Sequence, residues 1–68
     1  MKFPNIECEI TRNNMNKEVF CSKLKISRKT YFNWQNKGNI PSKKLEVMAN
    51  LFDCSTDYLL GLKENRSN

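Results

Sequence analysis

The stretch from residue 28 to residue 36 combines cationic, amide and aromatic side chains at helical spacing. At about 100° per residue, one arc of about 140° holds a mainly polar group, namely Arg28, Lys29, Phe32, Asn33 and Asn36. The opposite side holds Thr30, Tyr31 and Trp34. Arginine and lysine donate hydrogen bonds to guanine O6 and N7, and asparagine pairs bidentately with adenine. The pattern predicts a helix whose aromatic side packs inward and whose polar side can contact DNA bases.

Positive charge is concentrated around the same stretch. The chain of 68 residues has a net charge of +5. Residues 16–44 contain eight lysine or arginine residues and one acid, Glu18, which gives this segment +7 and the rest of the chain −2. A general solvated surface would intersperse the two signs. The concentration of charge therefore indicates that a polyanion is the partner.

Other chemistries lack the residues that they need. The sequence has no histidine, and its three cysteines, Cys8, Cys21 and Cys54, are widely spaced. This spacing argues against a zinc site and against a disulfide framework. We expect each cysteine to fill the core of a cytoplasmic protein, where thiols stay reduced. With no glycine-rich phosphate loop and no nucleophile–base set, we expect no enzyme activity, no cofactor, no metal and no small-molecule substrate.

Apolar stretches are also too short for a membrane protein. A span needs about 20 consecutive apolar residues, and the longest apolar run is far shorter than that. We therefore expect no membrane partner.

Periodicity and capping residues predict an all-α domain of five short helices. The first helix opens at Pro4 or Asn5 and stops at Asn13–Asn14. Residues that cap helix N-termini precede the other four helices, at Asn16, Ser27, Ser42 and Ser55. The third helix ends near Asn36, and Gly38 in the loop that follows is expected at positive φ.

Apolar residues on one side of each predicted helix define the expected core. These residues are Ile6, Ile10, Phe20, Cys21, Leu24, Ile26, Tyr31, Trp34, Leu45, Met48, Ala49, Phe52 and Leu59. Leu59, Leu60 and Leu62 either complete the core or line a dimer interface, and we expect the core to include some of them. The domain is expected to cover residues 1–62, and residues 63–68 form a polar, flexible tail.

The second and third predicted helices are separated only by Lys25, Ile26 and the capping Ser27, which fits a helix-turn-helix. A reading helix enters the major groove by its N-terminal end, so base contacts should cluster there. The predicted base-contacting residues are Ser27, Arg28, Lys29, Phe32 and Asn33. Phosphate contacts come from flanking helix N-termini and loop lysines. The predicted phosphate-contacting residues are Asn16, Lys17, Asn36, Lys37, Asn39, Lys43 and Lys44.

Three stretches also resemble a known family. Residues 15–27, M-N-K-E-V-F-C-S-K-L-K-I-S, resemble the pattern L-T-Q-E-E-L-A-E-K-L-G-V-S. Residues 28–36, R-K-T-Y-F-N-W-Q-N, are similar to R-S-T-I-S-R-W-E-N, and residues 55–61, S-T-D-Y-L-L-G, to S-x-D-Y-L-L-G. These patterns are typical of the Cro/C1-type helix-turn-helix family of phage and bacterial repressors. The resemblance covers about residues 5 to 62.

The resemblance implies a five-helix, lambda-repressor-like fold and a homodimer that binds a two-fold symmetric operator. Carried over by position, it assigns base contacts to the same five residues as above. It also assigns phosphate contacts to five of the seven, namely Asn16, Lys17, Asn36, Lys37 and Lys43.

Three positions depart from the family pattern. Lys25 and Asn14 stand where the family usually has glycine, so the turn at Lys25 is expected to be strained or altered. Phe32 stands where a polar residue is usual. Its ring either touches a thymine methyl group or packs sideways against the protein.

Two functions follow as hypotheses. The first is a sequence-specific regulator of transcription that binds double-stranded DNA, most simply a repressor of the phage or prophage type at a palindromic operator. The second is an antitoxin-like or adaptor module that uses the same fold to hold a partner protein. The second would need an exposed apolar patch, for which Val47, Leu51 and Leu62 are the candidates.

Overall fold

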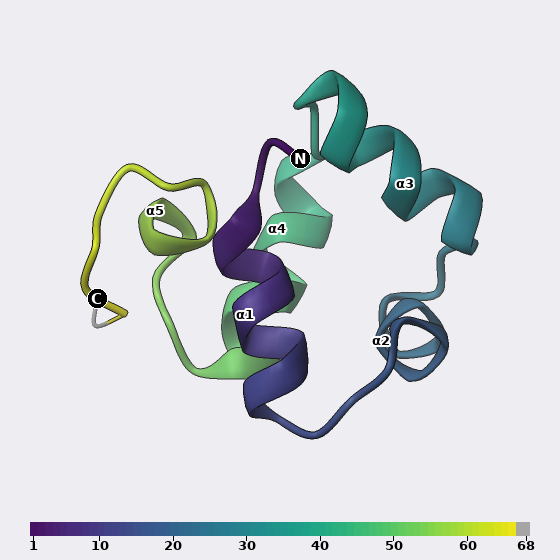
Figure 1. Cartoon of the computed structure of the whole chain (residues 1–68), viewed down its shortest axis with the longest axis horizontal. Coiled ribbons are helices and arrows are strands. Elements are labelled where there is room, and N and C mark those ends of the chain that lie inside the picture. Colours follow the sequence, from purple (N-terminus) through teal and green to yellow (C-terminus); the bar gives the residue numbers. More distant parts are fainter. Residues whose placement is uncertain (67–68) are drawn as a thin grey trace.

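The computed structural model describes residues 1–66 and contains five α-helices in this part of the chain (Figure 1). They are α1 (Pro4–Arg12), α2 (Lys17–Leu24), α3 (Arg28–Lys37), α4 (Ser42–Phe52) and α5 (Thr56–Leu59). The prediction of an all-α domain with five helices is thereby confirmed. Helices α1 and α4 occupy the middle, with α2 and α3 on one side and α5 on the other (Figure 1). None of the described helices has the length and apolar character needed to cross a membrane.

Three of the helices begin where the sequence predicts a capping side chain. The Val19 N–H donates to Asn16 Oδ1 at 2.8 Å, and the Thr30 and Tyr58 N–H groups donate to the hydroxyls of Ser27 and Ser55 at 3.1 Å. Each bond satisfies a backbone donor that has no partner within the helix.

The fourth helix begins differently from the prediction. Pro41 takes the capping position with extended backbone, and Ser42 is the first helical residue. The Pro41 carbonyl accepts from the Leu45 N–H at 3.0 Å. Since Ser42 already has helical backbone, its hydroxyl does not cap α4.

Residues with left-handed backbone conformation follow α1, α2 and α4, although none of them is glycine. Asn14, Lys25 and Asp53 have φ values of 58°, 57° and 53°. After α2, the Lys25 N–H donates to Ser22 O at 3.1 Å and the Ile26 N–H to Cys21 O at 3.0 Å, so two carbonyls in the last turn of the helix are satisfied. Gly38 ends α3 with φ 76°, as predicted.

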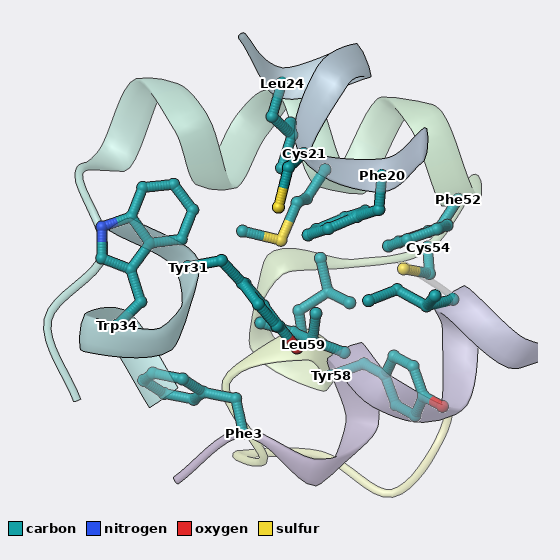
Figure 2. Close-up of a cluster of buried hydrophobic side chains, with 13 residues drawn as sticks. Phe3, Phe20, Cys21, Leu24, Tyr31, Trp34, Phe52, Cys54, Tyr58 and Leu59 are labelled. Atoms are coloured by element: carbon teal, nitrogen blue, oxygen red, sulfur yellow. The ribbon is translucent and has the colours of Figure 1, made fainter. Parts of the chain in front are cut away.

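An aromatic cluster joins α2, α3 and α4. The Phe20 ring of α2 meets the Tyr31 ring edge to face, with centroids 5.3 Å apart. It stacks on Phe52 of α4 at 5.6 Å. Figure 2 shows Tyr31 reaching from α3 into the middle of the cluster, with Trp34 at its edge. Because one fully buried ring touches both neighbours, the positions of α3 and α4 are set through α2.

The observed core is close to the expected one. Ten of the thirteen expected core residues are buried, and Ile26, Leu45 and Ala49 are partly buried against them. The core also contains Phe3 and Tyr58, which were not among the thirteen expected core residues.

The prediction that all three cysteines lie in the core is wrong for Cys8. Cys21 and Cys54 are buried, but Cys8 is exposed. Cys8 lies two residues from both Ile6 and Ile10, about 200° around α1 from each, so it faces away from the side that they bury.

The C-terminal segment is attached to α1 through a buried carboxylate. Glu9 is only 1% exposed, and the Arg66 guanidinium donates to both of its oxygens at 2.9 and 3.0 Å. The Tyr58 hydroxyl donates to the same carboxylate at 3.2 Å, and Arg66 also donates to Phe52 O at 2.7 Å. The prediction that Arg66 belongs to a freely solvated tail is therefore wrong. Ser67 and Asn68, the end of that tail, lie outside the described residues.

These contacts change the acidity of Glu9. Burial alone would raise the pKa of this carboxyl, but hydrogen bonds and charge from Arg66, with smaller contributions from Tyr58 and Arg12, bring the pKa below its ordinary value of 4.5. The ionised form is thus favoured in the folded protein.

Replacing Lys25 with glycine should stabilise the protein. A side chain at left-handed φ costs about 1–2 kcal/mol, and the greater freedom of glycine in the unfolded chain offsets about half of the gain. We expect Lys25→Gly to raise the free energy of unfolding by about 0.5–1 kcal/mol, measured by urea denaturation. Lys23→Gly, within α2, is the matched control and should lower it by about 1 kcal/mol. If both variants are destabilised alike, Lys25 does not carry this strain.

Acid should weaken the fold through Glu9. The pKa of Glu9 is lower in the folded than in the unfolded state, so its stabilisation is present at neutral pH and is lost as the pH falls below about 4.5 towards the folded-state pKa. We expect the Glu9→Gln variant to be less stable than the original chain at pH 7, and the gap to narrow by pH 3. Urea titrations at the two pH values measure this, and a constant gap would contradict it.

Candidate nucleic-acid interface

Helix α3 buries its aromatic side and exposes its basic side. Tyr31 and Trp34 are 4% and 7% exposed, whereas Arg28 and Lys29 are exposed to solvent. On the outward side, Asn36 is also exposed and Asn33 is half-buried. Thr30 is half-buried, and its hydroxyl lies 2.9 Å from that of Ser27. The division of the helix that the periodicity predicts is the one observed.

A polar network fixes the buried side of α3 to α1 and to the N-terminal segment. The Tyr31 hydroxyl donates to Glu7 of α1 and accepts from Gln35 Nε2 at 2.8 Å. The Gln35 side chain accepts from the Phe3 N–H at 2.8 Å and donates to the Phe3 carbonyl at 3.0 Å. The backbone carbonyl of Gln35 accepts from the Lys2 N–H. No buried side-chain nitrogen or oxygen within residues 1–66 lacks a hydrogen-bond partner. The network holds α3 against rotation about its axis.

Burial and the bond to Glu7 keep the Tyr31 hydroxyl protonated. Burial raises the pKa of Tyr31, and the hydrogen bond to the Glu7 carboxylate raises it further. The hydroxyl therefore remains a donor to Glu7 at any physiological pH. No role was predicted for Gln35 from the sequence. Its position four residues after Tyr31 places the two side chains next to each other on the helix, and this spacing could have indicated their contact.

The N-termini of α3 and α4 carry cations where a helix dipole disfavours them. Acidic residues occupy the first turns of α1, α2 and α5, and in α2 the acid Glu18 follows Lys17, whereas the first turns of α3 and α4 contain no acid. In contrast, the first turn of α3 holds Arg28 and Lys29, and that of α4 holds Lys43 and Lys44. A cation near a helix N-terminus costs a few tenths to about 1 kcal/mol. Arg28, Lys29 and Lys43 therefore do not stabilise the helices that they begin, and the positive potential at these helix ends attracts anions.

The predicted phosphate-contacting residues lie in different environments. Asn36, Lys37, Asn39 and Lys43 are exposed. Asn16 caps α2, and Lys17 lies 3.5 Å from a Glu7 carboxylate oxygen. Lys44 is half-buried, and its ammonium donates to Leu24 O at 2.7 Å, where it satisfies the C-terminal end of α2. Lys44 thus has a structural partner that its sequence position did not reveal.

A concavity of about 540 Å³ lies beside the exposed side of α3. It brings together five of the predicted contact residues, namely Lys17, Arg28, Lys29, Phe32 and Asn36. Met1, Glu7, Tyr31 and Gln35 complete its lining, and none of these four was predicted to belong to the site. The remaining predicted residues, Asn16, Ser27, Asn33, Lys37, Asn39, Lys43 and Lys44, are not among those that line it.

Phe32 projects from the basic side of α3. The residue is 62% exposed. The ring therefore does not pack sideways against the protein, which is one of the two alternatives that the sequence leaves open. An exposed aromatic ring between cationic residues is available for apolar contact with a partner.

Comparisons of the chain with protein-family models, with curated proteins and with solved structures gave no match. The proposed function therefore depends on the residues and geometry of this chain.

Removing the Tyr31 hydroxyl should loosen the attachment of α3. Tyr31→Phe leaves Glu7 without a buried donor and removes the acceptor of one Gln35 bond, and losing such a partner costs about 1–3 kcal/mol. We expect a fall of that size in the free energy of unfolding. Phe32→Leu, one residue further along on the exposed side, should change it by less than about 0.5 kcal/mol. Equal effects of the two substitutions would show that the network does not hold the helix.

Proposed function

We propose that this chain is a sequence-specific regulator that binds double-stranded DNA, with α3 as the helix that enters the major groove. The observation that carries the proposal is the division of α3, where buried Tyr31 and Trp34 lie opposite exposed Arg28 and Lys29. Groups that donate to base edges are thus presented on a helix whose orientation is fixed.

The arrangement around α3 supports the same reading. Helices α2 and α3 contact each other, are separated by three residues, and run in different directions, as α2 is seen end-on where α3 runs across the view (Figure 1). The phosphate contacts that set the position of the reading helix come from the end of α3, the loop after it and the first turn of α4, where Asn36, Lys37, Asn39 and Lys43 are exposed.

The resemblance to Cro/C1-type repressors extends the proposal. It places a homodimer of this chain on an operator with two-fold symmetry, where binding blocks access to a promoter. A small repressor of the phage or prophage type is the simplest form of this function.

The test compares a base contact with a phosphate contact. Selection from random duplexes should yield a palindrome with half-sites about 10 bp apart. On that sequence Arg28→Ala should lose about 1–3 kcal/mol of binding free energy and relax one base position. Lys43→Ala should weaken binding to all sequences alike and reduce the salt slope by about 1.

Circular dichroism of both variants checks that the fold is kept. If Arg28→Ala and Lys43→Ala have the same effects on selected and random DNA, α3 is not the reading helix. If no duplex is bound at low salt, the proposed function is wrong.

An alternative function is a protein-interaction module of the antitoxin or adaptor kind. Val47 and Leu62 are exposed apolar side chains, and Leu51, one turn after Val47, is half-buried. Gel filtration of the chain with a labelled duplex, with and without lysate, separates the two functions. Under this alternative, the chain elutes with a protein partner and leaves the duplex free.

A further inference from the structure

We propose that Glu7 limits the affinity of this chain for DNA, because it neutralises Lys17 in the free protein and repels phosphate in the complex. The inference rests on the proposed function and adds to it a residue that works against binding. Lys17 then has to exchange the Glu7 carboxylate for a phosphate when DNA binds.

The position of Glu7 sets it apart from the other acids. It is the one acidic residue among those that line the concavity beside α3, and Lys17, Arg28 and Lys29 line the same concavity. The other acid of α1 that forms ion pairs, Glu9, is directed towards Arg66 and Tyr58 in the core. A single negative charge thus lies in a concavity whose other charged side chains are all basic.

Two contacts prevent Glu7 from turning away from an approaching anion. One carboxylate oxygen accepts from the buried Tyr31 hydroxyl, and the other lies 3.5 Å from Lys17 Nζ. About a quarter of the Glu7 side chain remains accessible, with 26% exposure against 46% for Lys17. Its charge is therefore open to solvent and is felt at the surface where phosphates would lie.

The bond to Tyr31 also explains why an acid stands here. Glu7 supplies the acceptor that the Tyr31 hydroxyl needs, and it lies in the first turn of α1, where a negative charge is favourable. A neutral amide oxygen could accept the same bond. The acceptor function therefore does not require the charge, and the charge can be removed separately.

The experiment measures the affinity of Glu7→Gln for the selected operator and for a random duplex at low salt. The variant keeps an acceptor for Tyr31 while losing the charge. We expect the affinity to rise about fivefold, which corresponds to one unit-charge interaction across about 4 Å in water. The rise should be equal on both duplexes, because phosphates carry no sequence information. It should shrink as salt screens the charge.

Glu64→Gln is the matched control, because it makes the same change in net charge at an exposed residue. Glu64 belongs to the C-terminal segment, which lies at the opposite end of the molecule from α3 (Figure 1). It should leave the affinity nearly unchanged. Equal gains for the two variants, or no gain for Glu7→Gln while the original chain binds DNA, would overturn the inference alone. An original chain that binds no duplex would overturn the proposed function as well.

A second measurement does not depend on the stability of the Glu7 variant. If Lys17 leaves Glu7 for a phosphate, Lys17→Met should lower the slope of log K against log salt by about 0.9. An unchanged slope would show that Lys17 stays with Glu7 in the complex and would contradict the proposed exchange.

Discussion

The contact between the aromatic side of α3 and the core determines most of what this small protein presents to its surroundings. Tyr31 packs on Phe20, Phe20 stacks on Phe52, and three helices are thereby fixed to one another. The hydroxyl of Tyr31 adds a directional constraint through Glu7 and Gln35 that apolar packing alone does not provide. Because one side of α3 is held in this way, its other side must face solvent.

Several cations at this surface lie where they oppose local stability. Arg28, Lys29 and Lys43 stand in the first turns of α3 and α4, where the helix dipole opposes them and no acid is present, while the first turns of α1, α2 and α5 contain acids. Local rules are most often broken where a protein meets a ligand. The proposed role in DNA binding accounts for this pattern, and the proposed effect of Glu7 makes the surface a balance of attraction and repulsion.

Local signals in the sequence were sufficient to predict the presence of the five helices, three of their capping residues and the two sides of α3. Capping by Asn16, Ser27 and Ser55 depends on residues within one turn, so these helix starts could be predicted. Contacts between distant residues could not be predicted. The bond from Lys44 to Leu24 O joins residues 20 apart, and the pair of Glu9 and Arg66 joins residues 57 apart. Neither contact produces a periodic pattern in the sequence. The burial of Gln35 could not be predicted either, because it is polar and does not belong to an apolar pattern.

The most direct test of the account follows backbone amide signals by NMR while a selected duplex is added to the labelled protein. Signals from residues 16–17, 27–36 and 37–44 should shift, while the indole N–H of Trp34 and the amides of α5 should stay where they are. Shifts confined to α5 and the C-terminal segment, or a large shift of the Trp34 indole N–H, would contradict the claim that the buried side of α3 stays in the core while its basic side meets DNA.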